Sequence, residues 1–335
     1  MTPLRIAVIE GGPSSEAEVS RASAEGVRAA LVLAGHEVVN CALDATLPGV
    51  LERLRPDVVF PIVHGAIGED GCLQGMLEVL GVPYVGSAVL ASALACDKVM
   101  AKRLFRAARL PVAEEALVER SEDLTAAAQR VRAELGAAVV VKPSGQGSAI
   151  GVTRVDALAS NDELSRALQI ALDFDAVALC ERFVVGREIT CGVLDTATLG
   201  PARALPPTEI FARASGFYDF TSRYAQGGSS HQCPAALPDH VLREVQRVAL
   251  AAHRALGCRD LSRADFVVGD GSDPARITLL EVNTLPGMTR TSLFPEAAAV
   301  DGTAMPELCH ALVLGALQRG VRHFGQARAL PSAVS

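Results

Sequence analysis

Short apolar runs alternate with amphipathic stretches through the first third of the chain. Apolar runs within 4–12, 36–43 and 57–65 predict strands, and the spacing of apolar residues within 15–35 predicts a helix. Strands that alternate with helices favour a parallel sheet built from βαβ units. Ligands of such sheets bind at the loops that follow the carboxyl ends of the strands. Here those loops are "EGGPSSEAE" and "HGAIGEDG".

From about Leu94 the pattern changes to helices mixed with paired strands. Two β-rich runs within 137–155 are joined by a glycine-rich loop, which predicts a hairpin-like unit. Strands are also expected on both sides of Gly186, and two antiparallel strands within 262–283. Helices are expected at 97–110, at 239–257 and within 305–323. A chain of 335 residues exceeds what one hydrophobic core usually supports, so an α/β protein of two or three domains is expected.

Charge and apolar content exclude several classes of partner. The formal net charge is −7 and no basic stripe is present, which argues against nucleic acid as a partner. No apolar run reaches the roughly 18 residues of a membrane span, and the opening apolar segment is too short for a signal peptide. No membrane partner and a cytoplasmic location are therefore expected. The eight cysteines form no C-x-x-C pair, so free thiols are expected rather than a zinc site.

Lysine is rare in this chain, with three lysines among 31 basic residues. Where arginine replaces lysine almost everywhere, a remaining lysine indicates a need for a compact, mobile ammonium group. Lys98 and Lys142 fit that interpretation, whereas Lys102 fits chance retention on a solvated helix face.

The segment "ITLLEVN" is expected to be a strand, and two oxygen-bearing side chains, Glu281 and Asn283, lie at its end. Residues i and i+2 of a strand share a face, so both side chains point to one place. Asp265 lies on the preceding strand, which an intervening turn lets pair antiparallel with this one. Such an all-oxygen set favours Mg²⁺ over zinc or copper. The alternative is that some of these oxygens only cap turns.

The loop "KPSGQGSAIG" offers a second candidate site, for phosphate. Its glycines let backbone amides approach phosphate oxygens, and Lys142 adds charge. The loop does not match the Walker pattern G-x-x-x-x-G-K-[ST]. By itself it is a weak signal, because glycine-rich hairpins are often only tight turns.

Six motifs, in order and spacing, resemble those of the D-alanine:D-alanine ligases of the ATP-grasp superfamily. The resemblance runs from about Ile6 to Ala298. The motifs are "GGPSSEAEVS", "HGAIGEDGCLQGMLE", "YVGSAVLASALACDK", "VVVKPSGQGSAIG", "LGCRDLSRADF" and "LLEVNTLPGMTRTSL". The resemblance implies an ATP-grasp fold, with an N-terminal parallel-sheet (Rossmann-like) domain followed by two α+β domains that clamp ATP under a glycine-rich lid. We place these domains at 1–97, 98–186 and 187–335.

The resemblance also implies the reaction. In such ligases ATP phosphorylates the carboxylate of the first D-alanine, and the amine of the second attacks the acyl phosphate to give D-alanyl-D-alanine for peptidoglycan precursors. Two Mg²⁺ ions, for which Mn²⁺ can substitute, neutralise the transferring phosphoryl group. The implied metal ligands are Asp265, Glu281 and Asn283. The implied ATP contacts are Lys98 and Lys142 to phosphates, Glu181 and the backbone of Val184 to adenine, and Glu188 to ribose.

Further residues are implied to hold D-alanine. Glu16 resembles the anchor of the first substrate's ammonium group, with His64 nearby. Arg263 and the Gly287 amide resemble donors to the tetrahedral oxyanion. Ser292 and Leu293 match positions that contact the second substrate, while Ser148 and Tyr224 resemble lid hydroxyls that link with Glu16.

The lid segment departs from the family pattern. The segment 218–224 reads "YDFTSRY", in which Thr221 stands where an acid is usual and Arg223 where a lysine is expected to help bind the second carboxylate. In the glycine-rich loop, Gly145 and Gln146 stand where a larger, charged pair is common.

Two alternatives stay open: a ligase that makes another D-alanyl dipeptide or a depsipeptide, and a nucleotide-binding regulator without catalysis. A homodimer is implied by resemblance.

Overall fold

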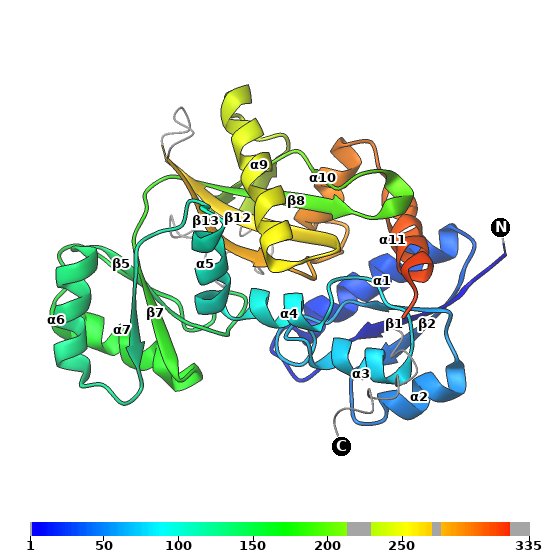
Figure 1. Ribbon diagram of the computed structural model, residues 1–335, viewed down its shortest axis with the longest axis horizontal. Coiled ribbons are helices and arrows are strands. Elements are labelled where there is room, and N and C mark those ends of the chain that lie inside the picture. Colours follow the sequence, from blue (N-terminus) through cyan, green and yellow to red (C-terminus); the bar gives the residue numbers. More distant parts are fainter. Residues whose placement is uncertain (1, 213–228, 270–275, 322–335) are drawn as a thin grey trace, which may run out of the picture.

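Three β-sheets, each with its own helices, form the frame of the molecule (Figure 1). The structure is a computed structural model and describes residues 2–212, 229–269 and 276–321. In the view of Figure 1 the first sheet lies at lower right, the second at left and the third at the top. Across the described ranges, no helix combines the length and apolar character needed to cross a membrane.

The first sheet has three parallel strands in the order β2–β1–β3. Four consecutive residues of the central strand are buried, because both faces of the sheet are covered. The βαβ pattern predicted from the sequence is confirmed. The elements are β1 (Arg5–Glu10), α1 (Ala17–Leu33), β2 (Glu37–Ala42), α2 (Leu47–Leu54), β3 (Val58–Pro61) and α3 (Cys72–Leu80).

The second sheet is antiparallel, in the order β4–β7–β5–β6. β5 and β6 form the predicted hairpin-like unit, whose connection is the glycine-rich loop. A capping box starts α7, in which Ser160 Oγ accepts from the N–H of Glu163 and the Glu163 carboxylate accepts from the N–H of Ser160. The elements are β4 (Glu115–Glu119), α6 (Leu124–Leu135), β5 (Val139–Pro143), β6 (Thr153–Val155), α7 (Asn161–Phe174) and β7 (Val177–Arg182).

The third sheet has the order β11–β10–β8–β12–β13, with β9 paired to β8. Gly186, expected in a turn with a strand on each side, lies where the chain crosses from β7 in the second sheet to β8 in the third. A side chain there would meet the Val268 carbonyl at 2.4 Å, so the crossing requires glycine. The strands are β8 (Arg187–Asp195), β9 (Arg203–Ala204), β10 (Thr208–Ala212), β11 (Ser229–Gln232), β12 (Asp260–Val268) and β13 (Ile277–Asn283). The helices are α4 (Val89–Cys96), α5 (Lys98–Ala107), α9 (Asp239–Leu256), α10 (Leu293–Val300) and α11 (Met305–Arg319).

The apolar cores show which helices belong with which sheet. The second sheet and its helices α6 and α7 enclose a core of their own. Another core joins the third sheet to α4, α5 and α9, and a further core is shared by the first sheet, the third sheet, α10 and α11. The division at 1–97, 98–186 and 187–335 remains a proposal. The packing of α5 argues for counting this helix with the third sheet.

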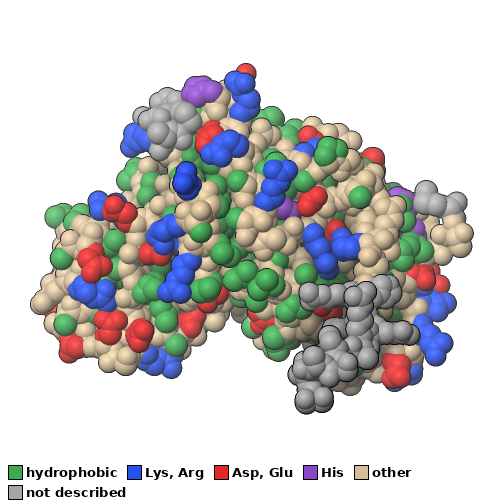
Figure 2. Space-filling model, viewed as in Figure 1, with side chains coloured by type: hydrophobic (Ala, Val, Ile, Leu, Met, Phe, Trp, Pro, Cys, Tyr) green, Lys and Arg blue, Asp and Glu red, His purple; other side chains and the backbone are tan. Residues whose placement is uncertain are grey.

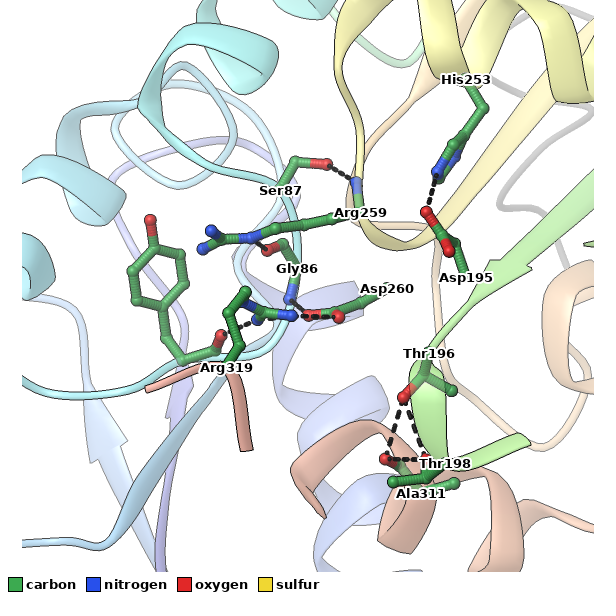
Figure 3. A network of polar contacts seen from close by, with 11 residues as sticks. Gly86, Ser87, Asp195, Thr196, Thr198, His253, Arg259, Asp260, Ala311 and Arg319 are labelled. Atoms are coloured by element: carbon green, nitrogen blue, oxygen red, sulfur yellow. Dashed lines mark hydrogen bonds and ion pairs between the residues drawn. The ribbon is translucent and has the colours of Figure 1, made fainter. Parts of the chain in front are cut away.

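A polar network fixes the start of β12 (Figure 3). The fully buried Asp260 carboxylate accepts hydrogen bonds from Arg319 at 2.6 and 2.8 Å and from the N–H of Gly86 at 2.7 Å. Arg259 donates to the carbonyl of Gly86 at 2.8 Å. The network therefore ties α11 and the segment before α4 to the first residues of β12.

Replacing Arg319 with methionine is expected to lower the free energy of unfolding by about 3 kcal/mol, because buried Asp260 loses its charged partner. Urea unfolding followed by circular dichroism measures the change. Arg203→Met is the control, since Arg203 and Asp301 form a pair at 2.9 Å whose side chains are 33% and 27% exposed. Its cost is expected to stay below about 1 kcal/mol. Equal losses in the two variants would contradict the assignment.

Candidate active site

A cavity of about 730 Å³ is lined by strands of the third sheet, by α1 and loops of the first sheet, and by the glycine-rich loop of the second sheet. The space-filling view shows the surface hollowed between the lobe at left and the rest of the molecule (Figure 2). Most of the predicted site residues reach this one cavity. They are Glu16, His64, Lys98, Ser148, Glu188, Arg263, Asp265, Glu281, Asn283, Gly287, Ser292 and Leu293.

The first sheet contributes the two loops that follow β1 and β3, as predicted. Ser14 joins them, because its hydroxyl donates to the carbonyl of His64 at 2.7 Å. Glu16 stands at the residue before α1 and is 7% exposed. Glu69, which the sequence reasoning did not single out, contacts His64 Nδ1 at 3.4 Å and accepts from the N–H of Gly65 at 2.9 Å. The sequence did contain a signal for Glu69, because this carboxylate follows His64 by five residues in the same loop.

His64 is a lining residue of the cavity. Its ring is buried, and Nε2 has no hydrogen-bond partner among the described residues. Burial lowers the pKa of His64, but the hydrogen bond and charge of Glu69, with the charge of Glu16, outweigh burial and raise this pKa above its usual value. His64 can therefore present a donor to a ligand beside Glu16.

The glycine-rich loop of the second sheet reaches across the cavity to the first sheet. Ser148 lies in the left-handed region, with φ of 50°, and its hydroxyl donates to Glu16. Lys98 Nζ donates to the carbonyl of Gln146 at 2.6 Å, and the Ser144 hydroxyl donates to Asp97 at 2.9 Å. The loop is thus held on both sides of the cavity by hydrogen bonds.

The candidate metal ligands lie together on β12 and β13. Asp265 pairs with Glu281 across the ladder, and Arg263 pairs with Asn283. Cross-strand partners share a face, so all four side chains point into the cavity. Each carboxylate already contacts a cation. Arg263 donates to both Asp265 oxygens at 2.9 Å, and Lys98 lies 3.4 Å from Glu281.

The predicted second-substrate end lies at the start of α10. Ser292 is the residue before this helix, and its hydroxyl accepts from the N–H of Thr289 at 2.9 Å. A side chain at Gly287 would meet Ser292 Oγ at 3.0 Å, so glycine permits this close turn. Unpaired N–H groups at a helix start suit a carboxylate. The predicted lid residues Arg223 and Tyr224 lie outside the described residues, as does Thr221.

The predicted adenine residues Glu181 and Val184 do not line the cavity, and neither does Lys142, a predicted phosphate contact. Glu181 is buried and contacts both Lys142 and Lys102. Burial raises the pKa of Glu181, but the charges of Lys142 and Lys102 outweigh it and lower this pKa below its usual value. The interpretation of Lys102 as a solvated residue is wrong, since only 1% of this residue is exposed.

Glu69→Gln is expected to lower the pKa of His64, because the variant lacks the carboxylate that accepts from its ring. Nuclear magnetic resonance titration of labelled histidine measures the change, and Glu18→Gln, on the exposed side of α1, is the control. The folded pKa of His64 lies above its unfolded value of about 6.5. The stability that protonated His64 contributes is therefore fully present below about pH 6.5 and is lost as pH rises through the folded pKa. An unchanged His64 titration in Glu69→Gln would refute the assigned cause.

Comparisons with known proteins identify the family of this chain. Residues 50–87 match the model of the D-ala D-ala ligase N-terminus, and residues 104–314 match that of the C-terminus. The D-alanine–D-alanine ligase of Geobacter sulfurreducens is 43% identical, over 93% of this chain and 94% of the relative, and that of Acidiphilium cryptum is 44% identical, over 94% and 99%. The crystal structure of the Bacillus anthracis ligase complexed with ATP superposes with a TM-score of 0.79 and 31% identity, over 94% of this chain and 98% of that one. The chain therefore belongs to the D-alanine–D-alanine ligase family.

Proposed function

We propose that the chain is an ADP-forming ligase that uses ATP to join two D-alanine molecules through an acyl phosphate. The observation that carries the proposal is the single cavity in which Glu16, Arg263 and the Asp265–Glu281 pair meet, although they come from separate parts of the chain. The product, D-alanyl-D-alanine, would serve peptidoglycan precursors, and hence cell-wall biogenesis and cell shape. A cytoplasmic location and a homodimer are part of the proposal.

Mg²⁺ fits the donor set on β12 and β13. The candidate site consists of two carboxylates and one amide. Among the described residues, no group of three histidine, cysteine or acidic side chains lies close enough together to hold a metal. All donors of the candidate site are oxygens, which Mg²⁺ prefers. When bound beside ATP, Mg²⁺ would neutralise charge on the transferring phosphoryl group. Asp265, Glu281 and Asn283 would hold it, in exchange for the contacts that Asp265 and Glu281 now make with Arg263 and Lys98.

The other residues act by position and charge. Glu16, held by the Ser148 hydroxyl, would bind the ammonium group of the first D-alanine. Arg263, once released from Asp265, and the N–H of Gly287 would stabilise the negative oxygen that forms when the second amine attacks. Ser292 and the start of α10 would hold the second carboxylate, with Leu293 beside its methyl group. Lys98 and Lys142 would contact phosphates, Glu188 the ribose, and Glu181 with the Val184 backbone the adenine, while Arg223 and Tyr224 would act from the lid.

With ATP and Mg²⁺, the protein is expected to form ADP, phosphate and D-alanyl-D-alanine only when D-alanine is present, because the substrate carboxylate is the acceptor of the phosphoryl group. Mass spectrometry of reactions with D-alanine, L-alanine and D-lactate identifies the products. Equal turnover with L-alanine would exclude the stereochemical assignment. A dominant D-alanyl-D-lactate product, when D-alanine and D-lactate compete at equal concentration, would favour the depsipeptide alternative.

Glu281→Gln is expected to reduce kcat by at least about 100-fold, because one ligand charge is lost beside the phosphoryl group. Phosphate release at increasing Mg²⁺ measures the effect. Glu307→Gln removes an exposed carboxylate from α11 and is expected to retain full activity. Near-normal activity of Glu281→Gln at saturating Mg²⁺ would show that the metal site lies elsewhere.

A further inference from the structure

Lys102 is a fully buried lysine on α5, and its ammonium group lies between two carboxylates of the second sheet. It contacts Glu181 and lies 3.1 Å from Glu115 Oε2. Glu115 and Glu181 are direct cross-strand partners on β4 and β7. Like charges in that relation destabilise a sheet, so the pair requires a cation between its members. The geometry gives Lys102 this place.

Glu181 has a second cation, Lys142 from β5, on its other oxygen. Lys142 is partnered with Leu179 in the ladder, so it reaches Glu181 diagonally. The Lys102 ammonium contacts Oε1 of Glu181, and the Lys142 ammonium contacts Oε2. Lys142 is also a proposed phosphate contact, and it cannot serve phosphate and Glu181 equally. Once Lys142 turns to a phosphate, Lys102 is the cation that remains on Glu181.

We propose that Lys102 is a positioning residue for nucleotide selection: it keeps Glu181 ionised and oriented, so that Oε2 accepts a hydrogen bond from the exocyclic amine of adenine. This inference rests on the adenine role of Glu181 in the proposed function. The charged groups that face Glu181 are Lys102 from α5, Lys142 from β5 and Glu115 from β4. Of these charged residues, Arg106 contacts only Glu115, and the Arg106 side chain is 40% exposed.

Removal of Lys102 would leave two buried carboxyl groups side by side. One of them would then bind a proton, because both charges cannot persist at this separation in a buried site. A protonated Glu181 would no longer offer the amine of adenine a charged acceptor, and its O–H group, a donor, would compete for the place that faces this amine. A nucleotide with a carbonyl group at that ring position, such as inosine triphosphate, would not suffer from this change.

The test measures binding of ATP and inosine triphosphate, both with Mg²⁺, by calorimetry. The unmodified protein is expected to prefer ATP at every pH from 6 to 9. Lys102→Met is expected to weaken ATP binding at least about tenfold at pH 7, as for loss of one charged hydrogen bond, and to change inosine triphosphate binding less than threefold. ATP binding by the variant should recover as pH rises, since Glu181 then ionises. Arg106→Gln, the matched control, is expected to bind both nucleotides as the unmodified protein does.

A double variant tests whether the charges of Lys102 and Glu115 balance each other beside Glu181. Lys102→Met combined with Glu115→Gln removes one charge of each sign, and ATP preference is expected to return to within about threefold. If Lys102→Met does not fold, Lys102→Gln, which keeps a donor but no charge, carries the same expectation. An unchanged ATP preference in a folded single variant, or equal loss of both nucleotides without pH dependence, overturns the inference. Because binding is measured without D-alanine, failure of the ligase reaction in the unmodified protein is a separate outcome.

Discussion

The pairing of β12 with its two neighbours determines the geometry of the cavity. β12 lies between β8 and β13, so Arg263 and Asp265 are held from both sides and brought opposite Asn283 and Glu281. The strand cannot slide by one residue without turning these side chains to the opposite face. Its first residue, Asp260, is fixed by Arg319 and Gly86, and these contacts tie α11 and the segment before α4 to the ladder.

Several charged residues in the cavity, and one pair outside its lining, form ion pairs with one another. Arg263 holds Asp265, Lys98 contacts Glu281, and Lys142 contacts Glu181. In each pair, one member is suited to a phosphate or an oxyanion and the other to a cation or an amine. Binding of a metal–nucleotide complex would exchange these internal partners for external ones of the same sign, so the site would avoid unpaired charge both before and after binding.

Several features of the fold and site could be predicted from local sequence patterns. The period-2 placement of Glu281 and Asn283 and the alternation of strands with helices each depend on short segments. The roles of Lys102 and Glu115 were missed because they depend on the pairing of β4 with β7, which places Glu115 beside the distant Glu181. A signal did exist for Lys102, since it lies three residues from Val99 and from Phe105 on the buried side of α5. The crossing at Gly186 was also missed, because a turn between paired strands and a crossing between sheets look alike in sequence.

The distribution of apolar cores has a consequence for motion. The first and third sheets share a core, so moving one against the other would expose apolar side chains. The second sheet has a core of its own, and the contacts described here that join it to the rest of the molecule at the cavity are polar. Rotation of this unit as a rigid body would therefore exchange these hydrogen bonds for water and leave the unit's own apolar core intact. The ion pairs of Lys102 lie at the boundary between this unit and α5.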